Sequence, residues 1–228
     1  MKPRFNIFTW NNIHAVLFCF LLVLYTVFPV RYPVIIAGGI SFFYYWAVNF
    51  EALKAYKPFA GYANWITLLR LLLIFFTVTG MNQLPDFGIF FIGLTIFVLD
   101  GLDGLIARKF KQESEFGAYF DMETDAFFVC IFTIIIYEKG LAGYWIIIPG
   151  FMRYLYGFII WVTGKKNDEE IKSKIGPLIA GLFFSAVLTP FILPEKYYLP
   201  VLVVSSALLM LSFLYSFIRI FKVRKPVS

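Results

Sequence analysis

The chain has 228 residues, of which 61% are hydrophobic and only 15% are charged, and its formal net charge is +6. This composition excludes an ordinary soluble domain, which needs far more polar surface to cover its core. The single histidine, His14, excludes a histidine-based metal site or catalytic triad. Cys19 and Cys130 lie inside apolar runs, which is typical of small core residues rather than of a disulfide or metal ligands. We therefore expect an integral membrane protein.

Eight stretches of the sequence are apolar enough to be membrane spans, for which a helix needs about 20 mostly apolar residues. They are residues 14–30, 33–50, 64–80, 87–106, 117–137, 142–163, 176–193 and 199–220. The first run lacks a small-residue cleavage site, so we interpret it as a retained span rather than a signal peptide. Only Arg31 and Tyr32 separate it from the second run, which predicts a tight hairpin. The expected fold class is all-α, a polytopic integral membrane helical bundle of about eight transmembrane helices.

The basic residues are distributed unevenly between the two sides of this bundle. Three of the 20 Lys and Arg residues lie in loops on one side and two, Arg70 and Arg153, lie within spans, which leaves fifteen on the other side. The positive-inside rule then predicts that both termini and the loop at 107–116 face the cytoplasm of a bacterial inner membrane. The net positive charge is expected to face anionic membrane lipids or phosphate groups, with no nucleic acid as a partner.

Four aspartates interrupt the apolar pattern where the fourth span ends and the fifth begins. Asp100 and Asp103 are three residues apart, and Asp121 and Asp125 are four apart, so each pair shares one helix face. A short loop joins the two antiparallel helices, which brings the four carboxylates together near the membrane surface. Carboxylates so close together need cations, and Arg108 is the only cation suitably placed within the motif. Oxygen ligands favour two Mg²⁺ or Mn²⁺ ions, which would clamp a pyrophosphate.

Small residues accompany the aspartates. Gly101, Gly104 and Gly117 each cost about 1 kcal/mol in a helix relative to alanine, which is tolerable where a ligand or backbone approaches closely. Gly104 and Ala107 could leave a slot for a flat base or a ribose. The alternative is that acids at a helix end merely mark the water boundary. We assign that role to the three neighbouring glutamates, Glu113, Glu115 and Glu123.

The stretch from Asp100 to Asp125 reads D-x-x-D-G-x-x-A-R, eight further residues, then G-x-x-x-D-x-x-x-D. It resembles, at all eight fixed positions, the signature of the CDP-alcohol phosphotransferase family, the class I CDP-alcohol phosphatidyltransferases. The resemblance implies a homodimeric membrane enzyme that moves a substituted phosphate from a CDP-linked lipid donor to a small or phosphorylated alcohol and releases CMP. It also implies a six-helix catalytic core at 64–228, preceded by a transmembrane hairpin and surface segment at 1–63.

The resemblance also implies roles for individual residues. It implies a metal-binding set of Asp100, Asp103, Asp121 and Asp125. Asp125 resembles the residue that serves as general base on the acceptor hydroxyl. The donor-binding positions would be Gly104, Ala107, Arg108 and Gly117. Family members carry an N-x-x-T-x-x-R element as well, here Asn64, Thr67 and Arg70. Asn64 and Thr67 could contact the CDP group, although a role as polar residues at a helix start is equally compatible with the sequence.

The acceptor site is less well defined. An arginine in the middle of a span, such as Arg153, usually faces a partner or a wet cavity. We assign Arg153 to the acceptor site, with pairing to a structural acid as the alternative. Lys172 and Lys174 lie where family members bind phosphorylated acceptors, but they also fit simple positive-inside markers. CDP-diacylglycerol is the favoured donor, while glycerol phosphate, serine, inositol phosphate and choline all remain open as acceptors.

Two other protein classes are also compatible with paired aspartates. A UbiA-type prenyltransferase combines D-x-x-D with D-x-x-x-D to bind a magnesium pyrophosphate, but in widely separated regions. Here both pairs fall between residues 100 and 125. A transporter or channel could use the acids as an ion site without enzymatic activity, but it would not need the intervening A-R pair and glycines. The sequence therefore favours the phosphotransferase.

Overall fold

The computed structural model of the protein describes residues 7–164 and 175–222, and all regular structure in these ranges is helical. The helices are α1 (Ile7–Val27), α2 (Tyr32–Leu53), α3 (Tyr62–Gly80), α4 (Asp86–Lys109), α5 (Glu115–Glu138), α6 (Ile147–Thr163), α7 (Ile175–Ala186) and α8 (Glu195–Lys222). Six helices in the described ranges are long and apolar enough to cross a membrane: α1, α2, α3, α4, α6 with the 3₁₀ turn before it, and α8. The predicted fold class is confirmed.

The bounds of the predicted spans differ by a few residues from those of the helices, and two of the spans, the first and the seventh, differ most. The first helix begins at Ile7 rather than at residue 14, because its first turns are packed: Trp10 is buried and its indole nitrogen donates to the Ser41 carbonyl oxygen, 3.0 Å away. The seventh span is not one continuous helix. α7 ends at Ala186, and a 3₁₀ turn follows that contains Pro190. Proline has no amide hydrogen and clashes with the carbonyl four residues earlier, which explains the break.

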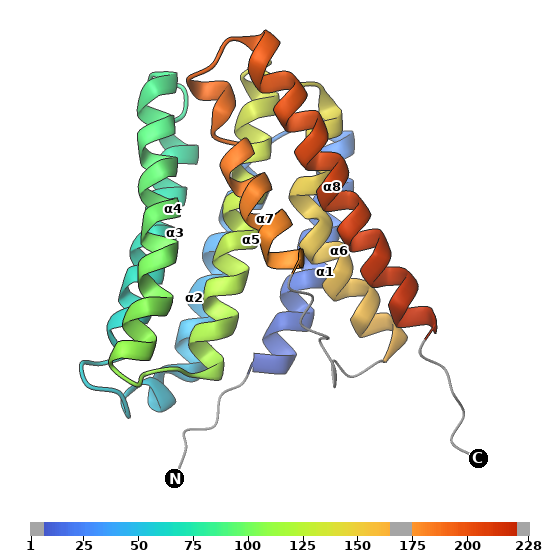
Figure 1. The fold of residues 1–228 in the computed structure, drawn as a ribbon. Helices are drawn as coiled ribbons and strands as arrows, with labels where there is room; N and C mark the ends of the chain where they lie inside the picture. The colour runs from blue at the N-terminus through green and yellow to red at the C-terminus, as the bar shows by residue number, and fades with distance from the viewer. Residues whose placement is uncertain (1–6, 165–174, 223–228) are drawn as a thin grey trace.

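α5 is the central helix of the bundle. Figure 1 shows it between α3 and α4 on one side and α6 and α8 on the other. Every residue from 126 to 136 except Val129 is buried, so this half of the helix has no lipid-facing side. Phe128 stacks on Phe184 of α7 with ring centroids 3.8 Å apart. Because this second half is packed on all sides, it fixes the position of the first half of α5, which carries the acidic residues.

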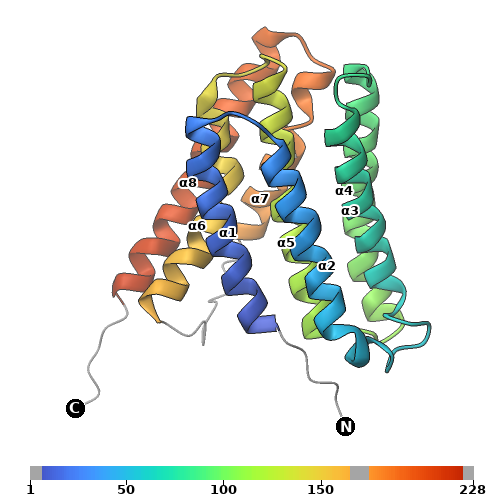
Figure 2. The same cartoon turned by 180° about the vertical axis from the view of Figure 1, so that it is seen from behind.

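The amino-terminal hairpin packs directly against this central helix and against α6 (Figure 2). On α1, Phe18 stacks on Tyr154 of α6 with centroids 4.2 Å apart. On α2, Tyr45 stacks on Phe116 of α5 at 4.5 Å, and its hydroxyl donates to the Phe116 carbonyl oxygen at 3.1 Å. The hairpin is therefore part of the packed bundle, and the division of the chain after residue 63 stays a prediction.

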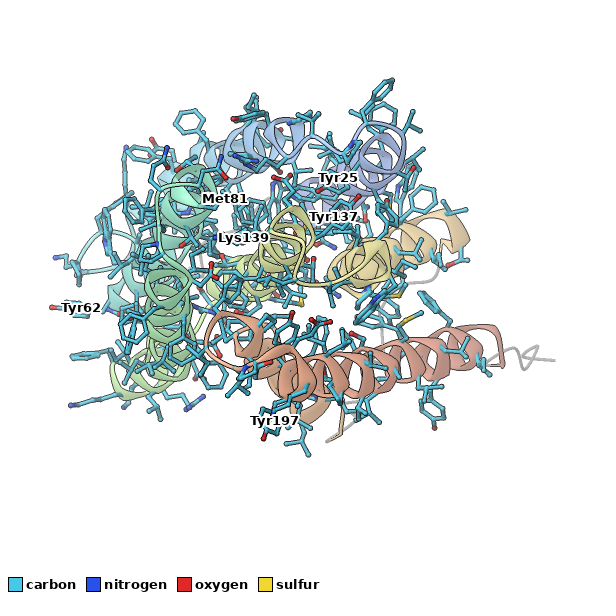
Figure 3. The ribbon with its side chains drawn as sticks, turned by 90° about the horizontal axis from the view of Figure 1, so that it is seen from above. Tyr25, Tyr62, Met81, Tyr137, Lys139 and Tyr197 are labelled. Atoms are coloured by element: carbon cyan, nitrogen blue, oxygen red, sulfur yellow. The ribbon has the colours of Figure 1, made fainter. Side chains whose placement is uncertain are left out.

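A hydrogen bond and an ion pair join helices at the end of the bundle that Figure 3 views from above. Tyr25 of α1 lies beside Tyr137 of α5 and donates to Glu138 at 3.3 Å. Lys139 contacts Asp86 at the start of α4, 2.7 Å away. The opposite end, at the bottom of Figure 1, contains the α4–α5 connection together with the start of α1 and the end of α8. The aspartate motif lies toward that lower end.

Candidate active site

The four predicted aspartates converge on one arginine of α3. Arg70 is fully buried, and its Nη1 lies 2.6 Å from Oδ2 of Asp103 and 2.5 Å from Oδ1 of Asp121. Its Nη2 lies 2.6 Å from Oδ1 of Asp100 and also donates to Asp125. One guanidinium thus joins α3, α4 and α5. We refer to Arg70 and the four aspartates as the aspartate cluster.

Arg108 is the cation that the sequence predicts within the motif, but the aspartates contact Arg70 instead. Arg108 is exposed, and its Nη1 would lie 3.6 Å from a β-carbon placed on Gly104. Two signals point to Arg70 in retrospect. An arginine within a span is expected to pair with an acid, and its spacing from Asn64 and Thr67 puts all three side chains on one helix face.

The other two residues of the N-x-x-T-x-x-R element are buried beside the cluster. The Thr67 hydroxyl donates to Oδ2 of Asp103 at 3.0 Å. Asn64 donates from Nδ2 to the Ala60 carbonyl oxygen at 2.7 Å. Its Oδ1 would lie only 2.9 Å from a β-carbon at Gly117. The lack of a side chain at Gly117 therefore lets α5 approach α3 closely.

A cavity of about 180 Å³, here the α3–α5 cavity, adjoins the aspartate cluster between α3, α4 and α5. Asp103 and Asp121 line it, together with all the residues predicted to bind the donor: Asn64, Thr67, Gly104, Ala107, Arg108 and Gly117. Gln112 also lines it and accepts at 2.9 Å from the amide of Tyr62 while donating at 2.9 Å to the carbonyl oxygen of Lys57. This side chain ties the start of α3 to the α4–α5 connection.

A second cavity of about 360 Å³, here the α4–α8 cavity, borders the other two aspartates. Asp100 and Asp125 line it together with Arg153, and most of the remaining lining comes from apolar side chains on α4 to α8. The aspartate cluster therefore separates two cavities of different character. One is lined by small and polar signature residues, and the other by apolar groups and a single arginine.

Comparison with known proteins identifies the family. Residues 61–218 match the model of the CDP-alcohol phosphatidyltransferases. The chain belongs to this family. The match covers α3 to α7 and most of α8, and so includes both cavities, whereas α1 and α2 lie outside it.

Curated relatives of this CDP-alcohol phosphatidyltransferase share one name, CDP-diacylglycerol--glycerol-3-phosphate 3-phosphatidyltransferase. The protein from Wigglesworthia glossinidia brevipalpis is 34% identical over 113 residues, which are 45% of this chain and 61% of the relative. The protein from Haemophilus influenzae is 37% identical over 99 residues, which are 42% of this chain and 52% of the relative. The chain thus spans about half the length of the curated relatives it matches. No solved structure matches it.

The aspartate cluster of this CDP-alcohol phosphatidyltransferase fits a divalent cation. Asp100, Asp103 and Asp121 can each present a carboxylate oxygen within 4.8 Å of the others. Such an all-oxygen set suits Mg²⁺ or Mn²⁺ better than zinc. Arg70 supplies one positive charge against four carboxylates, so the cluster keeps an excess of negative charge that divalent ions would offset.

The predicted surroundings of Glu123, within the signature stretch, are wrong. It was expected to be solvated, like Glu113 and Glu115, which are exposed. Instead it is only 3% exposed, and its Oε1 accepts from Nη2 of Arg153 at 3.0 Å. The reason is that α5 is central, so α1 and α6 cover this face of it. Arg153 pairs with a buried acid, which was the alternative for this residue, and it also lines the α4–α8 cavity. Its place in the acceptor site stays a prediction. The other predicted acceptor residues, Lys172 and Lys174, lie outside the described residues.

Proposed function

We propose that the protein transfers the phosphatidyl group of CDP-diacylglycerol to glycerol 3-phosphate and releases CMP. The observation that carries this proposal is that two cavities of different chemistry border the aspartate cluster, each lined by two of its four aspartates. A reaction between a nucleotide-linked lipid and a small alcohol needs two such sites on either side of the reacting phosphorus. Family membership supports the donor class, and the printed names of the relatives support the acceptor.

The α3–α5 cavity suits the CDP group of the donor. Gly104 and Ala107 leave room for a flat ring on α4, and the exposed guanidinium of Arg108 offers paired donors to a phosphate. Asn64 and Thr67 add an amide and a hydroxyl from α3. Their present hydrogen bonds fix both side chains at the edge of the cavity.

The α4–α8 cavity suits an anionic acceptor. A guanidinium in an apolar surrounding binds phosphate strongly, because little water competes for its hydrogens. Arg153 occupies this position, and its side chain is 21% exposed. This charge favours a phosphorylated alcohol over a cationic acceptor such as choline. The apolar remainder of the cavity is compatible with the glycerol backbone and acyl chains of the lipid.

The proposed reaction is a direct displacement at phosphorus. The acceptor hydroxyl oxygen bonds to the phosphorus that carries the diacylglycerol, and the bond from that phosphorus to the oxygen bridging to CMP breaks. CMP leaves with the electron pair, and Asp125, which borders the α4–α8 cavity, takes the hydroxyl proton. Two Mg²⁺ or Mn²⁺ ions held by the four aspartates would neutralise charge on the phosphoryl oxygens and the leaving group. Arg70 holds the carboxylates of α4 and α5 together.

We also propose that the end of the bundle with the aspartate cluster faces the cytoplasm of a bacterial inner membrane. The basic loops at that end support this orientation. A homodimer is proposed on the family resemblance.

The test is to incubate the purified full chain with CDP-diacylglycerol, Mg²⁺ or Mn²⁺, and a panel of alcohols, and to measure CMP and the lipid product. We expect CMP and a phosphatidylglycerophosphate product with glycerol 3-phosphate, and none after chelation of the metal. Turnover with inositol phosphate, serine or choline but not glycerol 3-phosphate would overturn the acceptor. Absence of metal-dependent CMP release with every alcohol would overturn the function.

A further inference from the structure

A chain of buried polar side chains runs from the amino-terminal hairpin to the α4–α8 cavity. His14 of α1 is fully buried, and its Nε2 lies 3.9 Å from Oε2 of Glu123 on α5. The other oxygen of Glu123 accepts from Nη2 of Arg153 at 3.0 Å, and the same nitrogen lies 2.9 Å from the sulfur of Met122. The hairpin lies outside the family match, yet only one carboxylate separates it from the arginine of the cavity.

Ser41 and Trp10 of the hairpin fix the orientation of the His14 ring. The indole nitrogen of Trp10 donates to the Ser41 hydroxyl oxygen at 3.1 Å, which directs the hydroxyl hydrogen elsewhere. The nearest ring nitrogen, Nδ1 of His14, lies 2.7 Å from that oxygen and can accept the hydrogen. With the hydroxyl hydrogen assigned to this bond, we assign the ring hydrogen of His14 to Nε2, on the side of Glu123. Among the described residues, Nε2 has no hydrogen-bond partner of its own.

The consequence is that the two oxygens of Glu123 serve different helices. Oε1 accepts from Arg153 of α6, and Oε2 lies 3.9 Å from Nε2 of His14 on α1. A carboxylate that is 3% exposed has little water to orient it, so these two neighbours determine which way it points. The position of Glu123 in turn restrains the long side chain of Arg153, which otherwise has many rotamers available.

We propose that the hairpin is part of the acceptor site and that His14 is a positioning residue, which orients Glu123 and through it aims Arg153 at the phosphate group of the acceptor. This inference rests on the proposed function, since that function puts the acceptor beside Arg153. It assigns a role in substrate binding to α1 and α2, for which the family signature offers none.

The surroundings of His14 allow its shape and its polarity to be separated experimentally. Its ring packs among aromatic rings, with centroids 4.6 Å from Phe18, 4.9 Å from Trp10 and 5.3 Å from Phe42. His14→Phe preserves an aromatic ring in this pocket but removes the N–H. His14→Gln keeps both a donor for Glu123 and an acceptor for Ser41. Leu21→Ala, two turns further along α1 in the buried core, controls for loss of packing alone.

The decisive experiment measures KM for glycerol 3-phosphate and for CDP-diacylglycerol in these three variants and the wild type. We expect His14→Phe to raise the acceptor KM on the order of fivefold, because the buried carboxylate of Glu123 loses its polar neighbour on α1, with the donor KM unchanged. His14→Gln should restore most of the acceptor affinity. Leu21→Ala should lower the melting temperature but leave the ratio of the two KM values unchanged. An active, folded His14→Phe protein with the wild-type acceptor KM would overturn the inference.

The wild type in the same experiment separates this inference from the proposed function. If the wild type releases no CMP with glycerol 3-phosphate, the function fails, and the acceptor role of His14 fails with it. The connection between His14 and Arg153 is then judged from melting temperatures of His14→Phe, Arg153→Met and the double variant. If the double variant lowers the melting temperature by less than the sum of the two single variants, the connection is supported. If the decreases in melting temperature add up, the connection is overturned.

Discussion

Nη1 of Arg70 lies 2.6 Å from Oδ2 of Asp103, and this ion pair joins α3 to the signature helix α4. The same guanidinium reaches both aspartates of α5, so the acids of the signature are assembled by a residue thirty positions before it. A buried arginine without its acids, or the acids without the arginine, would leave uncompensated charge at the edge of an apolar bundle. Arg70 is therefore central to both the stability and the geometry of the site.

Replacing Arg70 with methionine should destabilise the metal-free protein by about 3–5 kcal/mol, because four neighbouring carboxylates lose their shared cation. Addition of Mg²⁺ or Mn²⁺ should recover part of this loss, since ions bound only by the folded state stabilise it. Denaturation of the purified protein with and without metal measures both effects. Arg108→Met is the matched control, and as an exposed substitution it should change stability by less than about 0.5 kcal/mol. Equal effects of the two substitutions would contradict the prediction.

Asp125→Asn should lower turnover by about 10²–10⁴-fold, because an amide cannot accept the proton of the acceptor hydroxyl. Nucleotide binding should be largely spared, since Asp125 borders the α4–α8 cavity rather than the α3–α5 cavity. Asp100→Asn is the comparison, and it should weaken metal-dependent CDP binding more strongly. CDP titrations of both variants, alongside turnover, test this division. An equally complete loss of CDP binding in Asp125→Asn would count against its role as the base.

Arg153→Met should raise the KM for glycerol 3-phosphate by about tenfold to a hundredfold, the effect of removing one charged hydrogen-bonding group. The KM for CDP-diacylglycerol should rise much less, because the predicted donor residues line the other cavity. Steady-state kinetics with each substrate varied in turn provide the comparison. Arg153→Lys keeps the charge and should lie between the methionine variant and the wild type. A larger rise in the donor KM would refute the assignment of the α4–α8 cavity to the acceptor.

Two glycines of the signature region should respond in opposite directions to alanine. A β-carbon at Gly117 would lie 2.9 Å from Oδ1 of Asn64, so Gly117→Ala should destabilise the protein by about 1–3 kcal/mol through overpacking. A β-carbon at Gly101 would meet nothing within 4 Å, so Gly101→Ala should stabilise it by up to about 1 kcal/mol through helix propensity. Thermal melts of the two variants decide the matter. A stabilising Gly117→Ala would contradict the close approach of α3 and α5 at Gly117, and a destabilising Gly101→Ala would contradict the open space beside Gly101.

The convergence of the four aspartates follows from local rules. The helical period puts Asp100 with Asp103 and Asp121 with Asp125, and a short connection brings the two pairs to one end of an antiparallel pair of helices. The role of Arg70 does not follow from them, because it depends on how α3 packs against α4 and α5. Pro190 is a sequence signal for a helix break, but the uninterrupted hydrophobicity of residues 176–193 favoured a single span.

The burial of Glu123 also depends on tertiary packing. Nothing in the sequence of α5 indicates that α1 and α6 cover one side of its first half. The sequence therefore predicts a solvated Glu123, whereas this side chain is buried. The same packing explains why the sequence predicts no functional role for the amino-terminal hairpin. Residues such as His14 and Phe18 make its contacts with α5 and α6, and in the sequence they belong to no motif that distinguishes them from other residues of a span.

The central claim is that the aspartates of α4 and α5 hold divalent ions at the junction of the two cavities. The most direct test is an experimental structure of the protein with saturating Mn²⁺ and CDP, with the anomalous scattering of manganese used to locate the ions. We predict anomalous peaks about 2 Å from carboxylate oxygens of Asp100, Asp103, Asp121 and Asp125. A map without a peak among these carboxylates, and with Arg70 as their only cation at saturating Mn²⁺, would contradict the account.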